Sequence, residues 1–160
     1  MGLDVWVARN DRGKAWNGTR LEGLPRVKAD LPVQFDEATT KTIELIDVLW
    51  LRGNAIVAAF EVESTTSIYS GLLRMADLLS MQPNLNIPLF LVAPSERRNK
   101  VITEVNRPTF RRLSPPLVEM CRYLSFESIR KKVGEVAAVV KYLKPEFLDE
   151  VAESCELEEA

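Results

Sequence analysis

The sequence predicts an α/β domain in which helices flank a central mixed β-sheet. β-prone apolar segments alternate with helical patterns, in the order strand, hairpin, helix, strand, helix, strand, helix. The hairpin is apolar on both faces, which is typical of sheets that are covered on both sides. With 160 residues, 46% of them hydrophobic, the chain is long enough for a proper core. We therefore expect one domain over residues 1–145, followed by an acidic tail over residues 146–160.

The N-terminal third is predicted to hold one strand, a long loop and a short helix. Residues 3–8 alternate along the chain as a strand does, and an Asn-Asp-Arg-Gly turn follows them. Because this strand starts almost at the first residue, we interpret the chain as a domain cut from a longer protein. Residues 14–34 contain two glycines and two prolines and are typical of a loop. Asp36 is a suitable N-cap for a short helix through about residue 42.

The middle of the chain is predicted to form a hairpin over residues 43–63, a helix over 66–81 and a buried strand over 87–93. A Gly-Asn turn signal divides the hairpin into its two strands. Ser64 or Thr65 is a suitable N-cap for the helix, which carries apolar side chains at helical spacing.

The last third is predicted to contain a polar helix over residues 96–105, a short strand over 122–126 and an amphipathic helix over 127–142. Pro145 then begins the acidic tail, whose pattern is compatible with a short final helix. These elements complete the expected sheet with helices on its faces.

Three carboxylates in the hairpin are the most informative feature of the sequence. Asp47, Glu61 and Glu63 stand among residues that are almost all apolar and β-prone. A carboxylate in such a strand is costly unless it is paired or bound to a metal. The strands contain no basic residue near the acids, since Arg52 lies in the turn at the far end. The hairpin therefore predicts a metal site, and the alternative is a buried network paired with an Arg or Lys from elsewhere.

The length of the hairpin loop decides whether the acids share a face. Side chains alternate with period two, so Glu61 and Glu63 point the same way. A two-residue loop would pair Asp47 with Phe60, and the aspartate would then miss that face. A three-residue loop, Gly53–Ala55, would pair Asp47 with Glu61, and Gly and Asn both tolerate the left-handed backbone that such loops use. We therefore predict the three-residue loop. The same face would be completed by apolar residues of both strands (Leu49, Leu51, Val57 and Ala59).

These residues resemble the PD-(D/E)xK nuclease superfamily, which has the restriction-endonuclease-like fold. The motif of that superfamily is an acid at the start of one strand and an acid-x-Lys at the end of the next. Asp47, after Ile46, stands for the Pro-Asp of the motif, Glu61 for the second acid and Glu63 for the lysine. A few restriction enzymes of the superfamily also carry Glu at this last position. The resemblance covers residues 36–95, and it implies a restriction-endonuclease-like core and a Mg-dependent endonuclease that acts on DNA.

The resemblance also implies roles for the acids, so that Asp47, Glu61 and Glu63 are the predicted catalytic residues. Carboxylates are hard oxygen ligands that suit Mg²⁺ or Mn²⁺. Asp47 and Glu61 are the expected ligands, with the backbone carbonyl of Val62 as a further one. The ion would polarise the phosphoryl oxygen and lower the pKa of the attacking water. Glu63 cannot replace the charge of the lysine, but it is able to hold a second cation or to accept a proton from the water.

Composition excludes several other kinds of chemistry. The chain contains no histidine, which rules out histidine triads, histidine bases and histidine metal ligands. Cys121 and Cys155 stand apart, so neither a zinc site nor a disulfide framework is indicated. No apolar run approaches the length of a membrane span, and the first residues show no signal-peptide pattern. We expect a reducing, cytoplasmic setting and no membrane partner.

The charge distribution points to DNA. Residues 97–132 carry ten basic and three acidic residues, whereas seven of the 23 acids lie in residues 146–159. We expect the basic segment to bind phosphates and the acidic tail to weaken that binding. The alternative is that these Arg and Lys side chains only solvate helix faces, and that Arg74 only extends along its helix to solvent. The predicted nucleic-acid-binding residues are Arg74, Arg97, Arg98, Lys100, Arg107, Arg111 and Arg112.

A second function from another class fits the same sequence. A nuclease-like fold is able to serve as a non-catalytic module that binds DNA or a protein partner, with Glu63 marking the loss of activity. Cleavage that depends on a divalent ion would distinguish the enzyme from the module. The sequence leaves open whether the chain forms a homodimer, whether it acts on DNA or RNA, and on one strand or two.

Overall fold

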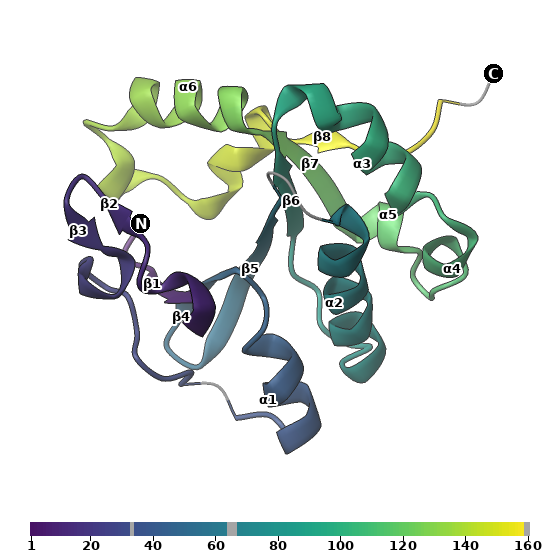
Figure 1. Cartoon of the computed structure of the whole chain (residues 1–160), viewed down its shortest axis with the longest axis horizontal. Helices are drawn as coiled ribbons and strands as arrows, with labels where there is room; N and C mark the ends of the chain where they lie inside the picture. Colours follow the sequence, from purple (N-terminus) through teal and green to yellow (C-terminus); the bar gives the residue numbers. More distant parts are fainter. Residues whose placement is uncertain (33, 64–66, 159–160) are drawn as a thin grey trace.

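Strands from the whole length of the chain join into one mixed sheet, which confirms the predicted α/β fold (Figure 1). The computed structural model describes residues 1–32, 34–63 and 67–158. The strand order in the main sheet is β1-β4-β5-β6-β7-β8. These strands are β1 (Asp4–Val7), β4 (Val48–Arg52), β5 (Ala55–Val62), β6 (Leu89–Ala93), β7 (Cys121–Ser125) and β8 (Glu153–Ser154).

The directions of the strands bring the three acidic side chains of the hairpin to one edge of the sheet. Strands β5, β6 and β7 are parallel neighbours, and β4 runs antiparallel to β5. The carboxyl ends of the parallel strands therefore meet at the edge from which β4 starts. Glu61 and Glu63 lie at the end of β5, and Asp47 directly precedes β4. The topology alone thus brings the two ends of the hairpin that carry acids to the same place.

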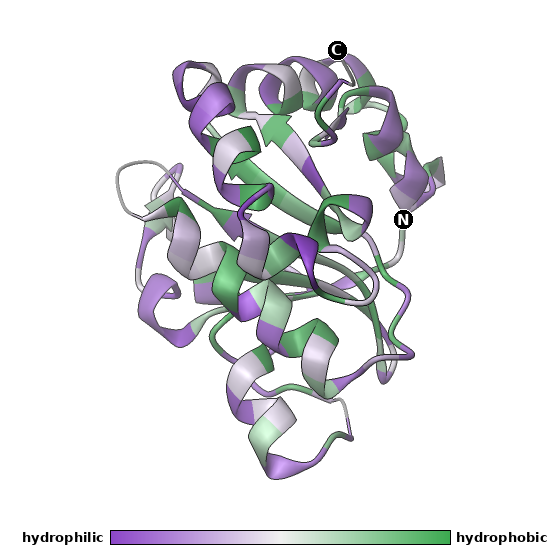
Figure 2. Cartoon of the chain, turned by 90° about the vertical axis from the view of Figure 1, so that its right-hand side faces the viewer, coloured by the Kyte–Doolittle hydropathy of each residue, from purple (hydrophilic) through white to green (hydrophobic). Residues whose placement is uncertain are grey.

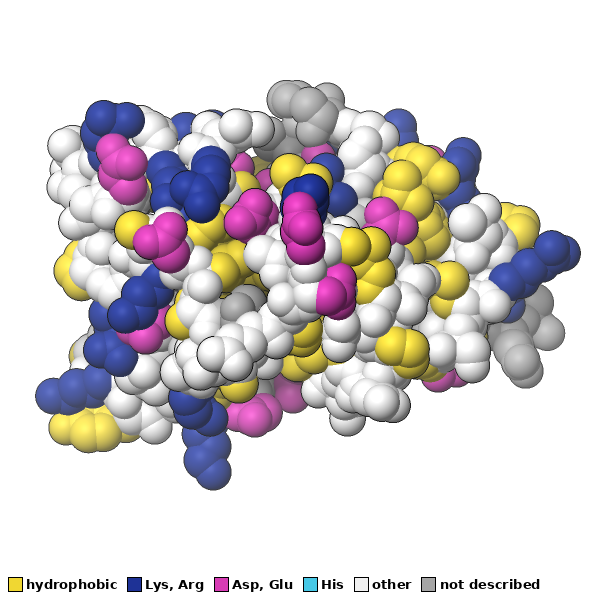
Figure 3. All heavy atoms as spheres, turned by 90° about the horizontal axis from the view of Figure 1, so that it is seen from below, with side chains coloured by type: hydrophobic (Ala, Val, Ile, Leu, Met, Phe, Trp, Pro, Cys, Tyr) yellow, Lys and Arg dark blue, Asp and Glu magenta, His cyan; other side chains and the backbone are white. Residues whose placement is uncertain are grey.

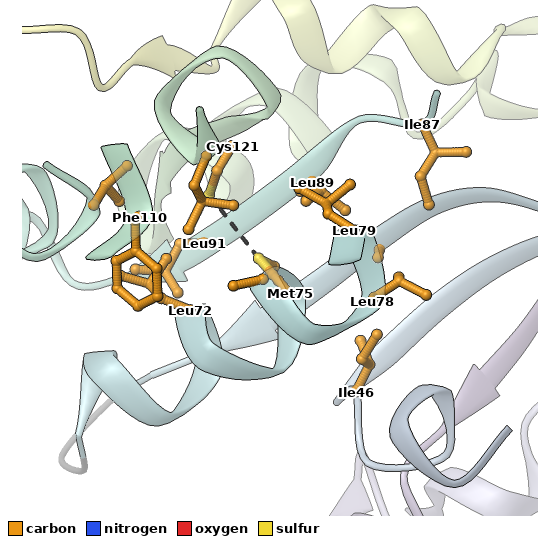
Figure 4. Close-up of a cluster of buried hydrophobic side chains, with 14 of the residues drawn as sticks. Ile46, Leu72, Met75, Leu78, Leu79, Ile87, Leu89, Leu91, Phe110 and Cys121 are labelled. Carbon is orange, nitrogen blue, oxygen red and sulfur yellow. Dashed lines mark hydrogen bonds between the residues drawn. The ribbon is translucent and has the colours of Figure 1, made fainter. Parts of the chain in front are cut away.

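Helices pack on one face of the sheet and form the larger core. They are α1 (Glu37–Ile43), α2 (Ile68–Met81), α3 (Arg98–Val105), α4 (Pro108–Arg111) and α5 (Leu117–Met120). In the close-up of Figure 4, Leu72 and Met75 of α2 lie beside Leu91 of β6, and the Met75 sulfur is 4.0 Å from that of Cys121. Figure 2 shows that the strands behind these helices are hydrophobic, whereas the outer faces of the helices are largely hydrophilic. Burial of this apolar face holds α2 against the sheet.

The opposite face is covered by α6 (Phe126–Val136) and by the C-terminal segment (Figure 1). Aromatic rings dominate this smaller core, where the ring of Phe60 lies 4.8 Å from that of Trp50 and 5.1 Å from that of Phe90. Such pairs add to the stability gained from buried area alone. Both faces of the hairpin are therefore covered, as its apolar sequence predicts.

Most elements match the expected ranges, and the differences have physical reasons. Asp36 caps α1 as predicted, because its carboxylate accepts a hydrogen bond from the Thr39 backbone N–H at 2.9 Å. The predicted caps Ser64 and Thr65 lie outside the described residues. The helix expected over 127–142 ends at Val136, and Val140–Tyr142 forms a separate 3₁₀ turn. Val140 is β-branched and 40% exposed, so little burial offsets its weaker helical preference.

The segment that was expected to be a loop contains a small hairpin of its own. Strands β2 (Ala15–Trp16) and β3 (Thr19–Arg20) pair across an Asn-Gly turn. Asn17 and Gly18 have φ values of 49° and 79°, the left-handed backbone that this type of turn requires at both positions. The Asn-Gly pair is the signal for this hairpin, although strands of two residues are too short for alternation to reveal.

The segment that was expected to be an acidic tail packs into the domain. Pro145–Glu150 forms a 3₁₀ helix, and β8 pairs with β7 as an edge strand. Leu148 and Cys155 are buried, and Asp149 forms an ion pair with Arg122 at 2.9 Å. The packed chain therefore continues past residue 145. The prediction of a free tail was wrong because it followed the many acidic residues of this segment, whereas a few apolar side chains anchor the segment to the domain.

Candidate functional site

The hairpin reaches the predicted alignment of acids by a different route. Arg52 pairs with Ala55, so the loop has two residues rather than the predicted three. Further along the hairpin, Leu51 pairs with Ile56, whereas Trp50 pairs with Ala58. Val57 is therefore left without a partner on β4 and forms a β-bulge, which is one extra residue in β5. Ile56 consequently takes the buried place that was predicted for Val57.

The bulge restores the register at the far end of the hairpin. Val48 pairs with Phe60, so Asp47 stands opposite Glu61 just beyond the last paired residues. The Asp47 carboxylate accepts a hydrogen bond from the backbone N–H of Val62 at 2.7 Å, which fixes it at the end of β5. The predicted loop length was wrong, but the pairing that the metal hypothesis required is present.

Asp47, Glu61 and Glu63 converge at this edge of the sheet. One carboxylate oxygen from each lies within 4.8 Å of the oxygens of the other two. Glu61 is fully buried, Glu63 is 4% exposed, and Asp47 is partly exposed. Three carboxylates at this separation repel one another unless positive charge is near. We refer to these three residues as the acid trio.

Helix α2 brings that positive charge to the acid trio. Arg74 donates two hydrogen bonds to Glu61, from Nε to Oε1 and from Nη2 to Oε2, both at 2.8 Å. The same Nη2 lies 3.9 Å from a carboxylate oxygen of Glu63. The alternative to a metal site was a buried network in which the acids pair with an Arg or Lys from elsewhere in the chain. Arg74 is such a partner. Its side chain keeps 28% exposure, so it closes one side of the trio and remains open to solvent.

A glycine makes this close approach of α2 feasible. A Cβ atom at Gly71 would lie 3.0 Å from Oε1 of Glu63 and 3.1 Å from Cβ of Glu61. A side chain at this position would require the glutamates or the helix to shift by a few tenths of an ångström. Gly71 therefore sets the distance from which Arg74, one turn further along α2, reaches Glu61.

Burial of Glu61 and its contact with Arg74 shift the pKa of Glu61 in opposite directions. The pKa of Glu61 is raised to about 8, because burial outweighs the hydrogen bonds from Arg74, which lower the pKa, and the charge of Asp47 adds a smaller increase. Glu61 in turn raises the pKa of Arg74, mainly through their hydrogen bonds, although burial of Arg74 opposes this. Additional positive charge at the trio would favour the ionised form of Glu61.

The acid trio opens into a pocket of about 660 Å³. Asp47, Glu63 and Arg74 line this pocket together with residues from the N-terminal segment. The N-terminal residues include an ion pair between Lys14 and Asp11 at 2.5 Å. The pKa of Lys14 is raised, first by its hydrogen bond to Asp11 and to a smaller extent by Asp47. No pattern in the sequence points to Lys14, because only the folded chain brings it near residue 47.

The other predicted DNA-binding residues lie on α3 and α4 and in the residues next to these helices. Arg98 pairs with Glu153 at 2.6 Å, and Arg107 pairs with Glu104 at 2.8 Å. Arg107 also covers the ring of Tyr69, in the first turn of α2, at 5.0 Å. The remaining four predicted residues outside α2 are Arg97, Lys100, Arg111 and Arg112. Their contact with DNA stays a prediction, as does the role of the Val62 carbonyl.

Fold and site together define an α/β domain with a carboxylate trio and an arginine at the carboxyl edge of its sheet. Among the described residues, no helix has the length and apolar character needed to cross a membrane. The chain belongs to the family of the type II restriction enzyme NmeDI C-terminal domain, whose model matches residues 1–155.

One relative of the chain is the type II restriction enzyme NmeDI of Neisseria meningitidis serogroup C. The two sequences are 29% identical over 161 residues, which covers 97% of this chain and 45% of the relative. The chain therefore spans less than half the length of that relative. No solved structure matches the chain significantly.

Proposed function

We propose that this chain is a metal-dependent nuclease domain that cleaves DNA, in the manner of the PD-(D/E)xK superfamily. The observation that carries the proposal is the acid trio, with carboxylate oxygens from two neighbouring strands within 4.8 Å of one another. Membership of a family named after the C-terminal domain of a type II restriction enzyme supports DNA as the substrate.

The donor set of the trio fits Mg²⁺ or Mn²⁺. Carboxylate oxygens are the hard ligands that these ions prefer, and Asp47 and Glu61 would hold the ion with the carbonyl of Val62. Each oxygen of Glu61 accepts one hydrogen bond from Arg74 and keeps a second lone pair with which it would bind the ion. When bound, the ion would polarise a phosphoryl oxygen and lower the pKa of a water molecule.

Arg74 supplies the charge that the superfamily motif places at position 63. Its guanidinium lies 3.9 Å from Glu63 and faces the pocket beside Asp47. A guanidinium there stabilises negative charge on a phosphate and orients Glu61 through two parallel hydrogen bonds. Glu63, buried next to Arg74, is placed to hold that guanidinium or to accept a proton.

The bidentate contact of Arg74 also favours a second candidate function. If the Arg74–Glu61 pair is purely structural, the trio is a neutralised network, and the chain is a module that binds DNA or a protein without cutting. The two functions differ in one property, which is cleavage that requires a divalent ion.

The decisive experiment is incubation of the full chain with plasmid DNA across a titration of Mg²⁺ and of Mn²⁺. We expect cleavage that EDTA abolishes and that falls to background in Asp47→Asn and in Glu61→Gln. Each substitution removes a ligand charge with little change of shape, and circular dichroism checks that each variant folds. Strong cleavage by Asp47→Asn would refute the mechanism. Salt-sensitive binding of DNA without cleavage at any metal concentration would select the module.

A rescue experiment tests the role of Arg74. We expect Arg74→Gln to lose cleavage and the double variant Arg74→Gln/Glu63→Lys to regain part of it, because Lys at position 63 restores the usual cation. The single variant Glu63→Lys should retain cleavage at saturating metal. If Glu63→Lys is inactive there, Glu63 is itself an essential ligand or base. If the double variant stays inactive while Glu63→Lys is active, Arg74 has a role other than charge.

A further inference from the structure

We infer that residues 9–28, which we call the N-terminal arm, contact DNA beside the acid trio, with the ring of Trp16 stacked on a base. The inference rests on the proposed function, because it places the arm on the same substrate. It assigns the contact surface to a part of the chain that the charge pattern of the sequence did not single out.

The position of the arm is the first argument. The arm forms a wall of the pocket that Asp47 and Glu63 also line, so a phosphate held at the trio would have the arm as its neighbour. That wall is largely apolar, which suits the sugar and base of a nucleotide more than a second phosphate. Its apolar residues are Leu21, Leu24, Pro25 and Val27, next to Val5 and Val7 of β1.

Charge is the second argument. The arm carries six basic and two acidic residues, a net charge of +4. Figure 3 shows basic side chains concentrated on the side of the molecule where Figure 1 places β2 and β3. Lys14 and Arg20 are paired with Asp11 and Glu22, but these pairs are solvent-exposed on the lysine and arginine side. Exposed pairs of this kind are weak, so DNA phosphates are able to compete for them.

Residues 97–132, which the sequence predicts to bind phosphates, have more of their positive charge neutralised by acids from outside the segment. Among the described residues 97–132, Arg98, Arg122 and Lys132 each form an ion pair with an acid of the C-terminal segment. Arg107 pairs with Glu104 of the preceding helix. Folding therefore brings three outside acids to the cations of this segment, whereas the ion pairs of the described residues bring one outside acid to the arm, Asp4, which lies 3.5 Å from both Arg26 and Lys28.

The hairpin β2–β3 is the third argument, because it presents an aromatic ring at its tip. Trp16 is 63% exposed, although an indole ring gains much from burial. The base of the arm is held firmly by two arginines. Arg12 donates to the carbonyls of Val7, Lys28 and Ala29, and Arg26 donates to those of Gly2 and Leu3. A large ring on a tight turn with an anchored base loses little conformational freedom on stacking.

The test measures binding of the full chain to a fluorescein-labelled DNA duplex that ends in a single-stranded overhang of mixed sequence, whose unpaired bases are free to stack, by anisotropy in EDTA at several salt concentrations. We expect Trp16→Ala to weaken binding by about 5- to 100-fold, the range typical of removing one aromatic ring from a base stack, and Trp16→Phe to retain most of the affinity. Leu157→Ala serves as the control, because Leu157 is 55% exposed in the C-terminal segment and should have no effect.

A second variant tests the charges of the arm independently of its ring. Lys14→Gln/Arg20→Gln should lower the slope of log affinity against log salt by about 2, because each substitution removes one cation that neutralises a phosphate. Unchanged affinity of Trp16→Ala together with an unchanged slope would overturn the inference and leave the proposed nuclease intact. If the wild-type chain binds no DNA even at low salt, the proposed function fails as well.

Discussion

At the scale of single residues, the site depends on a helix and a strand end that nearly touch. Gly71 is the point of contact, since a Cβ there would meet Glu63 and Glu61 at 3.0 and 3.1 Å. The neighbouring Glu63 and Glu61 are buried and have little room to move away. The missing side chain at Gly71 thus allows α2 to pack directly on the two glutamates.

We expect Gly71→Ala to lower the free energy of unfolding by about 1–3 kcal/mol, the usual cost of overpacking. Urea unfolding measures the change, and cleavage should fall in parallel because Arg74 is displaced. Gly134 in α6 is the matched control, since nothing lies within 4 Å of an added Cβ there. Gly134→Ala should raise the stability by about 0.5–1 kcal/mol through the higher helical preference of alanine. Equal effects of the two substitutions would contradict the contact at Gly71.

At the scale of elements, the C-terminal segment is a structural part of the sheet rather than a free tail. Strand β8 extends the sheet by pairing with β7, and Leu148 packs against the aromatic core on the face of α6. Its acids form ion pairs with Arg98, Arg122 and Lys132. Removing the whole segment would therefore alter packing and charge together.

We expect deletion of residues 146–160 to destabilise the domain by at least about 3 kcal/mol, because the burial of Leu148 and Cys155 is lost. Thermal or urea unfolding measures this loss. Deletion of residues 157–160 alone is the control and should change the stability by less than about 0.5 kcal/mol. A stable protein without residues 146–160 would show that the segment adds only charge.

The expected effect of the acids on DNA binding is better tested by substitution than by deletion. Asp149→Asn with Glu150→Gln removes two charges and keeps the strand β8 in place. Because these acids pair with Arg122 and Lys132, we expect the variant to bind DNA more tightly at low salt. Unchanged affinity in the anisotropy measurement would show that these acids do not oppose the approach of DNA.

At the scale of the whole molecule, the reactivity of the two buried thiols, Cys121 and Cys155, indicates whether the chain is folded. Burial raises the pKa of Cys155 from its usual 9.0 to about 11, and it raises the pKa of Cys121 well above 9.0. A raised thiol pKa means that the folded state disfavours the thiolate. The corresponding contribution to stability is fully present below pH 9 and is lost as the pH rises from 9 through 11.

We therefore expect neither thiol of the folded protein to react appreciably with a disulfide reagent at pH 8, and both to react after unfolding in urea. Cys155 should react first as urea is raised, because it follows a two-residue edge strand, whereas Cys121 begins the interior strand β7. The variants Cys121→Ser and Cys155→Ser assign the two rates. Rapid labelling of Cys121 in the native protein would contradict the buried position of this thiol.

Features that follow from local pattern are predictable from the amino-acid sequence. Alternation and apolar runs predict the central strands, and Asp36 is recognisable as a helix cap, because these signals depend on neighbouring residues. The acid trio is predictable for the same reason, since three carboxylates in one apolar hairpin require a common neutralising charge. Even the wrong loop length leads to the right pairing, because burial of one face strongly restricts the register.

Features that depend on contacts between distant segments are visible in the folded chain and not in the sequence. The bulge at Val57 corrects the register in a way that no count along the strand reveals. The approach of α2 at Gly71 brings Arg74 to the trio as its cation, and the fold brings the N-terminal arm to the same pocket. The C-terminal acids resemble a free tail in the sequence, because composition records charge but not the partner that each charge meets. Pairing of distant charges is a property of the folded chain.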